Sequence, residues 1–205
     1  MLLTFEGIDC SGKSTQARLL AERLQKDRTV RFIREPGGTR ISERLRDILL
    51  DKRHLELTET CELFLFSASR AQLVAEVIRP ALQRGEFVIC DRYFDSTTAY
   101  QGYGRGIDRE AIARINALAT QGTNPDLTFV IDIPVDELEH RKQAAGQPVD
   151  RMESSGRQFY ERVRAGYTNM ARETQRIVMI DGTRPVQEIH DAVWNTLVLR
   201  NIIQS

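Results

Sequence analysis

The sequence predicts an α/β fold in three layers, with a five-stranded parallel sheet flanked by helices. Five short runs are apolar along most of their length, which is typical of strands buried on both faces. Helix-length amphipathic segments separate these runs, as crossovers between parallel strands require. A chain of 205 residues usually forms one domain. Ligands bind such sheets beyond the carboxyl ends of the strands, so we expect the functional site there.

Each element follows from a local pattern. The predicted strands are residues 2–7, 29–34, 87–91, 127–132 and 177–181. Apolar residues at helical spacing predict a helix from Ser14 onward, and similar patterns predict helices over residues 41–50 and 58–83. Polar or glycine residues stand at or directly after the ends of the strands, at Gly7, Glu35, Asp91, Asp132 and Asp181.

The composition argues against several classes of protein. Lysine plus arginine and aspartate plus glutamate both number 29, so the formal net charge is zero. A neutral chain is a poor general binder of nucleic acid or of membrane surfaces. The longest apolar runs reach about half of a membrane span, and we expect a cytoplasmic protein. The three cysteines lack C-x-x-C spacing, which argues against a zinc site or a disulfide framework.

Residues 7–14 (GIDCSGKS) fit G-x-x-x-x-G-K-[ST], the loop that cradles nucleotide phosphates. A chance match arises in roughly one chain in a hundred of this length. Here the match also lies between a predicted strand and a helix. We expect Lys13 to reach the β- and γ-phosphates of the nucleotide and Ser14 to ligate Mg²⁺. The predicted phosphate-binding residues are Gly7, Ile8, Asp9, Cys10, Ser11, Gly12, Lys13, Ser14 and Thr15.

Asp91 and Arg92 follow the third predicted strand. An aspartate there suits the acidic residue that holds Mg²⁺, although alone it is more often a helix cap or turn residue. Arg92 points into the same predicted cleft, where its guanidinium could bind phosphates; the alternative is a surface arginine. The chain has no guanine-reading N-K-x-D and no D-x-x-G after this strand, which argues against a regulatory GTPase. Its length suits a small kinase.

Four further stretches carry a resemblance to a known family. They are FEGID before the loop, REPGGT at residues 34–39, FSASR at 66–70 and DRYFDSTTAYQG at 91–102. In order and spacing the chain resembles the thymidylate kinases, in their bacterial form. The resemblance implies the P-loop nucleoside-monophosphate-kinase fold, transfer of the γ-phosphoryl group of ATP to dTMP, and Mg²⁺ as cofactor. It also implies a homodimer, with no nucleic-acid or membrane partner.

The same resemblance implies roles for individual residues. Phe66 would stack on thymine, although its pattern alone favours core packing. Arg70 would hold O4 of the base, and Tyr100 would crowd out a ribose 2′-hydroxyl. For Arg46 two interpretations are equally open: a contact with the acceptor phosphate, or a solvated helix residue. The implied dTMP-binding residues are Asp9, Glu35, Pro36, Phe66, Arg70, Arg92, Ser96, Thr97, Tyr100 and Gln101, and the implied catalytic residues include Lys13, Arg92 and Asp9.

A flap (lid) is predicted at about residues 141–156 within a single domain of residues 1–205. Some relatives carry a basic residue in the phosphate loop where this chain has Cys10, and others carry arginines in the flap. Because Cys10 cannot supply positive charge, the flap must, and we expect Arg151 first and Arg141 second. Bacterial relatives often have an arginine directly before the flap glycine, whereas Ala145 precedes Gly146 here. The alternative for this segment is a solvated surface turn.

Two rival functions stay open. A kinase for another monophosphate, such as UMP, CMP or dUMP, would have a similar pocket. A nucleotide-binding regulatory or scaffold protein would keep the loop without turnover.

Overall fold

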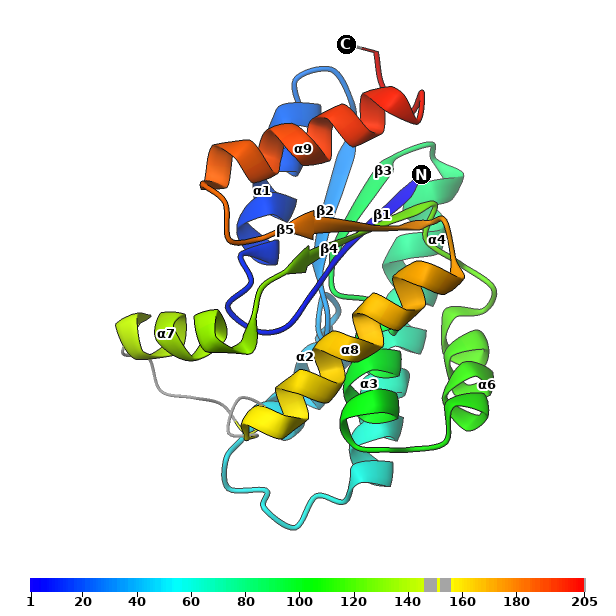
Figure 1. Cartoon of the computed structure of the whole chain (residues 1–205). Helices are drawn as coiled ribbons and strands as arrows, with labels where there is room; N and C mark the ends of the chain where they lie inside the picture. Colours follow the sequence, from blue (N-terminus) through cyan, green and yellow to red (C-terminus); the bar gives the residue numbers. More distant parts are fainter. Residues whose placement is uncertain (146–150, 152–155, 205) are drawn as a thin grey trace.

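The predicted five-stranded parallel sheet is present in the computed structural model, which describes residues 1–145, 151 and 156–204. The sheet order is β2-β3-β1-β4-β5 (Figure 1). All neighbouring pairs are parallel, and on β1 Phe5 pairs with Asp91 of β3 and Phe129 of β4. The strands are β1 (Leu2–Glu6), β2 (Val30–Arg34), β3 (Phe87–Asp91), β4 (Leu127–Asp132) and β5 (Ile177–Asp181).

This strand order creates a switch point between β1 and β3. From β1 the chain crosses to β2 on one side of the sheet, and from β3 it crosses to β4 on the other side. The connections therefore leave the carboxyl ends of these neighbouring strands in opposite directions, which opens a crevice there. The phosphate loop follows β1, and Asp91 with Arg92 lies at the end of β3.

Helices cover both faces of the sheet and complete the three layers. On one face α1 (Lys13–Leu24) and α9 (Val186–Leu199) lie together, as Figure 1 shows. Their buried Leu20 and Val193 share a core with Leu3 and Phe5 of β1. The other face is covered by α3 (Glu59–Leu73), α4 (Arg79–Gln83) and α8 (Arg157–Glu173), with α2 (Arg40–Leu50) and α6 (Arg109–Thr120) packed against α3.

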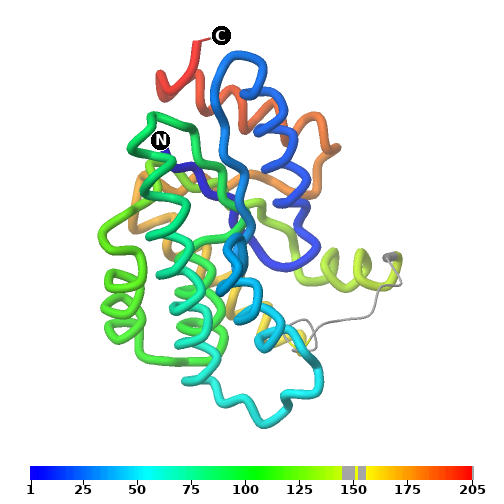
Figure 2. Tube along the Cα trace, turned by 180° about the vertical axis from the view of Figure 1, so that it is seen from behind, coloured from blue at the N-terminus to red at the C-terminus, as the bar shows by residue number. Residues whose placement is uncertain are grey.

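The helix predicted over residues 58–83 is one continuous run with a change of pitch. A π-helical segment, η1 (Val74–Ile78), joins α3 to α4, and Figure 2 shows the run as one long rod. Thr58 caps its start by accepting from the backbone N–H of Cys61. A second π-helical segment, η2 (Thr98–Gly104), continues α5 (Phe94–Thr97). π-helical turns occur frequently at functional sites.

The flap differs from its predicted outline. Helix α7 runs from Val135 to Ala145, so residues 141–145 of the predicted flap belong to a helix. Helix α8 begins at Arg157, directly after the predicted end of the flap. Residues 146–150 and 152–155 of the flap lie outside the described residues.

A polar network lies buried beside the sheet. Thr4 of β1 and Thr128 of β4 share a hydrogen bond of 2.7 Å between their hydroxyls. Arg176 donates to Thr128 and makes two hydrogen bonds of 2.7 Å to the carboxylate of Asp95. The side chain of Asp95 is 2 % exposed. The arginine therefore compensates a carboxylate that has lost its hydration.

Replacing Arg176 tests this network. Arg176→Met leaves Asp95 buried without its cation, so we expect the free energy of unfolding to fall by about 3–5 kcal/mol. Urea denaturation followed by circular dichroism measures the loss. Asp95→Asn in the same background should recover part of it because the buried charge is gone. A loss below about 1 kcal/mol would show that the pair contributes no more than a surface ion pair.

Candidate active site

The phosphate loop connects β1 to α1 and contains two glycines at positions where any other residue would be strained. Gly7 has a φ of 134°, and a Cβ there would lie 2.4 Å from the carbonyl oxygen of Ile131. Gly12 has a φ of 90° and precedes the first residue of α1, Lys13. The first amides of α1 thus point out of the helix toward the loop, where they favour an anion. The buried hydroxyl oxygen of Ser11 has no hydrogen-bond partner among the described residues.

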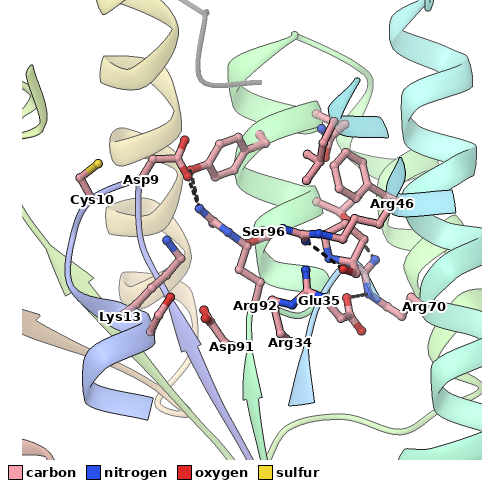
Figure 3. A pocket seen from close by; sticks show the side chains of 17 residues that line it. Asp9, Cys10, Lys13, Arg34, Glu35, Arg46, Arg70, Asp91, Arg92 and Ser96 are labelled. Atoms are coloured by element: carbon pink, nitrogen blue, oxygen red, sulfur yellow. Dashed lines mark hydrogen bonds and ion pairs between the residues drawn. The ribbon is translucent and has the colours of Figure 1, made fainter. Parts of the chain in front are cut away.

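A cavity of about 300 Å³ opens beside this loop at the switch point of the sheet (Figure 3). It contains all ten residues that were predicted to contact dTMP, together with Lys13, Ser14 and Asp91. Figure 3 shows the loop residues on one side and Arg34, Arg46 and Arg70 on the other, with Arg92 between them. The cavity is lined by Asp9, Cys10, Lys13, Ser14, Arg34, Glu35, Pro36, Arg46, Leu50, Phe66, Arg70, Asp91, Arg92, Ser96, Thr97, Tyr100 and Gln101.

Two helical runs line the side of the cavity away from the phosphate loop, which we call the acceptor side because most of the residues expected to contact dTMP lie there. On α3, Phe66 and Arg70 are four residues apart and share a face. The run from α5 into η2 presents Ser96, Thr97, Tyr100 and Gln101, again in pairs four residues apart. The four-residue spacing therefore places these side chains on common helix faces.

Most of the hydrogen-bond donors of Arg70 are used by contacts within the protein. Its side chain is 2 % exposed and pairs with Glu35 at 2.8 Å. It also donates from Nη1 to Thr97 and Asn116 and from Nη2 to the carbonyl oxygen of Tyr93. These bonds use four of the five N–H donors of a guanidinium. Arg70 therefore holds the wall of the cavity in place, with one donor remaining for a ligand.

Arg92 occupies the centre of the site. It has a left-handed backbone (φ 70°), which is unusual for a residue with a side chain and concentrates at functional sites. Its guanidinium donates to the carbonyl oxygen of Gly7 at 3.0 Å, to Ser96 at 3.1 Å and to Tyr100 at 3.1 Å. It also forms an ion pair with Asp9. The arginine thus links the phosphate loop to the acceptor side of the cavity.

Charge sets the protonation of the loop residues. Burial alone would raise the pKa of Asp9, but the charges of Arg92 and Lys13 outweigh it and hold this pKa below its usual range. Burial and the charge of Arg92 lower the pKa of Lys13. Tyr160 of α8 donates to the second carboxylate oxygen of Asp9 at 2.8 Å. Asp9 is therefore an ionised acceptor between two cations.

The residues predicted to hold Mg²⁺ fit such an ion. Asp91 is buried, and one of its carboxylate oxygens has no hydrogen-bond partner among the described residues. Ser14 lines the same cavity. An ionised oxygen together with a hydroxyl is the donor set that Mg²⁺ prefers when it also binds phosphates. No cluster of three or more acidic, histidine or cysteine ligands occurs among the described residues, so the ion would depend on the nucleotide for further ligands.

The two flap arginines lie on opposite sides of the site. Arg141 donates to the carbonyl oxygen of Cys10 at 3.1 Å and to that of Gly182 at 3.0 Å. Arg151 instead donates to Glu62 at 2.6 Å and to the carbonyl oxygen of Leu49 at 2.9 Å. The structure thus brings Arg141, the second choice from the sequence, to the phosphate loop and places Arg151 on the acceptor side.

Several residues of the site received no role from the sequence. Arg34 lines the cavity and pairs with Glu43 at 3.0 Å. Its place at the end of a strand could have indicated it. Arg46, left open by the sequence, also lines the cavity and donates to the carbonyl oxygen of Pro36 at 2.9 Å. Tyr160 carried no signal, because its contact with Asp9 joins residues 151 positions apart.

Comparisons with known proteins place the chain in a family. The sequence profile described as "Thymidylate kinase" matches residues 5–193. A thymidylate kinase of Chlorobaculum parvum is 49% identical over 207 residues, which cover 96% of this chain and 95% of the relative. One of Chlorobium luteolum is also 49% identical, with 96% of each chain covered. The crystal structure of a thymidylate kinase from Ehrlichia chaffeensis superposes with a TM-score of 0.80 at 36% identity, covering 96% of this chain and 98% of that one.

Glu6 lies behind Arg92 in an environment that disfavours its charge. It is fully buried at the end of β1, and it accepts from the backbone N–H of Tyr93, from Ser96 and from Tyr167. Burial, followed by the nearby charge of Asp95, raises the pKa of Glu6 to about 7. The hydrogen bonds and the charge of Arg92 oppose this rise without cancelling it.

This shift predicts a pH-dependent stability. Between about pH 4.5 and 7 the unfolded chain loses the proton of Glu6 while the folded protein keeps it, so stability falls as pH rises. We expect the fall to reach up to about 3 kcal/mol and to be absent in Glu6→Gln. Urea unfolding at pH 5 and at pH 7.5 measures the difference, with the exposed Glu188→Gln as control. An equal change in the free energy of unfolding between pH 5 and pH 7.5 in unaltered protein and in Glu6→Gln would contradict the prediction.

Proposed function

The chain belongs to the thymidylate kinase family, and we propose that it acts as a thymidylate kinase that transfers the γ-phosphoryl group of ATP to dTMP, giving ADP and dTDP. One observation of the structure supports this most directly. A single cavity joins the phosphate loop to all ten residues expected to contact dTMP. Donor and acceptor would therefore meet in one site.

We expect the acceptor nucleotide to occupy the side of the cavity away from the loop. We expect thymine to stack on Phe66 of α3, worth about 1–3 kcal/mol by analogy with other base–aromatic contacts. Tyr100 is 5 % exposed and would lie against the sugar. Arg46 and Arg34 would bind the acceptor phosphate, since both line the cavity near Pro36.

Transfer would rest on position and charge. An oxygen of the acceptor phosphate forms a bond to the γ-phosphorus, while the bond from that phosphorus to its bridging oxygen breaks and ADP leaves with the electron pair. The acceptor phosphate is already ionised at neutral pH, so no general base is needed. Arg92, between the two halves of the cavity, would neutralise both phosphates, and Lys13 would neutralise the donor.

Mg²⁺ would be held by Ser14 and by Asp91, which both line the cavity. One carboxylate oxygen of Asp91 has no hydrogen-bond partner among the described residues. When bound, the ion supplies charge that stabilises the triphosphate. Asp91 would contribute a fixed acceptor for it at the end of β3.

Arg141 would supply the positive charge that Cys10 cannot. Its guanidinium already contacts the backbone of the phosphate loop. Arg151 remains a candidate from the sequence, but its contacts with Glu62 and Leu49 favour a role on the acceptor side. We therefore reverse the order that the sequence suggested for these two arginines.

Two further expectations, on location and on oligomeric state, stay predictions. No helix in the described part of the chain is long and apolar enough to cross a membrane. A cytoplasmic location is proposed from the short apolar runs of the sequence and from the family, and a homodimer from the family alone. Size-exclusion chromatography with light scattering would measure the oligomeric state.

A coupled assay for ADP release tests the proposed function. We expect release from ATP to depend on dTMP and to be much slower with CMP or UMP. Preference for CMP or UMP would favour a kinase for another monophosphate. Nucleotide binding without turnover would favour a regulatory or scaffold protein.

Arg141→Ala should lower kcat by about 100-fold or more, because a cation that stabilises the moving phosphoryl group is lost. The Michaelis constant for dTMP should change little, since Arg141 contacts the loop and not the acceptor side. Steady-state kinetics measure both, with the exposed Arg172→Ala as control. Near-normal turnover in Arg141→Ala would remove this residue from the mechanism.

A further inference from the structure

Glu62 is a buried carboxylate that the proposed mechanism does not use. It lies on α3, four residues before Phe66, and its side chain is 1 % exposed. One of its oxygens, Oε1, accepts from the side-chain amide of Gln101 at 2.9 Å. Its other oxygen, Oε2, accepts from Arg151 at 2.6 Å. Arg105 lies 3.5 Å from Oε1. A charge buried this deeply requires such partners, so its neighbours are fixed with it.

This contact fixes the direction of the Gln101 amide. An ionised carboxylate only accepts hydrogen bonds, so Gln101 must turn its NH₂ group toward Glu62. Gln101 also lines the cavity. The atom that it can offer to a ligand there is consequently its carbonyl oxygen, an acceptor.

Thr97 offers the opposite character one helical turn away. Its hydroxyl oxygen accepts from Arg70 at 2.9 Å, which leaves the hydroxyl proton to be donated. Thr97 lines the same cavity. The wall thus carries an acceptor beside a donor. Thymine and uracil present a ring N3–H donor beside the O4 acceptor, whereas cytosine presents an N3 acceptor beside an amino donor.

We propose that Glu62 is a positioning residue for base selectivity, which orients Gln101 so that the cavity accepts thymine or uracil and rejects cytosine. The inference rests on the proposed function, because it assumes that the base of the acceptor lies against Gln101 and Thr97. Glu62 itself does not touch the base. It acts through the amide that it holds.

Glu62→Gln should reverse this orientation. A glutamine at position 62 has one oxygen and one NH₂ group to share between its partners. Arg151 is a charged donor at 2.6 Å, closer than Arg105 at 3.5 Å, so the oxygen turns toward Arg151. The NH₂ group then faces Gln101, whose amide must flip to accept from it. The cavity would now receive an NH₂ donor, which matches N3 of cytosine.

The experiment compares dTMP and dCMP as acceptors. We expect Glu62→Gln to lower the ratio of kcat/KM for dTMP to that for dCMP by at least about tenfold, chiefly through the Michaelis constants. Glu59→Gln, the same change on an exposed position of α3, should leave the ratio unchanged. Adding Arg151→Met to Glu62→Gln removes the donor that forces the flip and should restore selectivity toward its original value. An effect of Arg151 on phosphoryl transfer acts on both substrates and cancels in the ratio, and Arg151→Met alone measures any effect on acceptor binding.

An unchanged ratio in a folded Glu62→Gln overturns the proposal, and so does a loss of selectivity that Arg151→Met does not restore. Should the variant fail to fold, ¹⁵N-labelled unaltered protein decides. With dTMP bound, the side-chain amide protons of Gln101 should show their strongest nuclear Overhauser effects to Glu62. Stronger effects to the protons of the thymine ring would overturn the proposal. If unaltered protein does not phosphorylate dTMP, the proposed function fails. The dissociation constants of dTMP and dCMP for unaltered protein and Glu62→Gln then still test the orientation.

Discussion

A buried cation at the switch point of the sheet organises the site. Arg92 lies where the connections that follow β1 and β3 leave in opposite directions, and its largely buried charge requires hydrogen-bond acceptors around it. Asp9 and the carbonyl of Gly7 supply them from the phosphate loop, and Ser96 supplies one from the acceptor side. Because one guanidinium binds groups of the phosphate loop and of the acceptor side, the two halves of the cavity are held in a fixed relation before any nucleotide binds. Such preorganisation is what transfer by position and charge needs.

Buried carboxylates fix the orientation of the neighbouring side chains that line the cavity. Glu35 holds Arg70, and Glu62 holds Gln101. A buried carboxylate is stable only with such hydrogen-bond partners. The contacts that compensate Glu35 and Glu62 therefore also orient the side chains that line the cavity. The parallel sheet contributes the frame, because the ends of β1 and β3 carry the loop and Arg92.

Local patterns in the sequence were enough for much of this structure. The apolar runs predicted all five strands, with Gly7 and Thr29 falling just outside the strands observed. The loop motif was correctly expected between a strand and a helix, and the phosphate-binding role of its residues stays a prediction. The acceptor residues came from a resemblance to a family and not from periodicity, which for Phe66 favoured the core. Contacts between distant residues could not be predicted: Tyr160 reaches Asp9, and Arg151 reaches Glu62, across large separations in the chain. For the flap, charge alone could not rank Arg141 and Arg151, since only the path of α7 brings Arg141 to Cys10.

The cavity is not neutral, although the chain as a whole has zero formal net charge. Its lining includes the cations Lys13, Arg34, Arg46, Arg70 and Arg92 against the carboxylates of Asp9, Glu35 and Asp91. A recess with an excess of positive charge and walls of low polarisability focuses the electric field toward its opening. Anionic nucleotides are therefore drawn in faster than random collision allows, and this attraction weakens as dissolved salt screens it. A local excess of positive charge in one recess thus lets a chain of zero net charge attract anions in the way that a basic surface does.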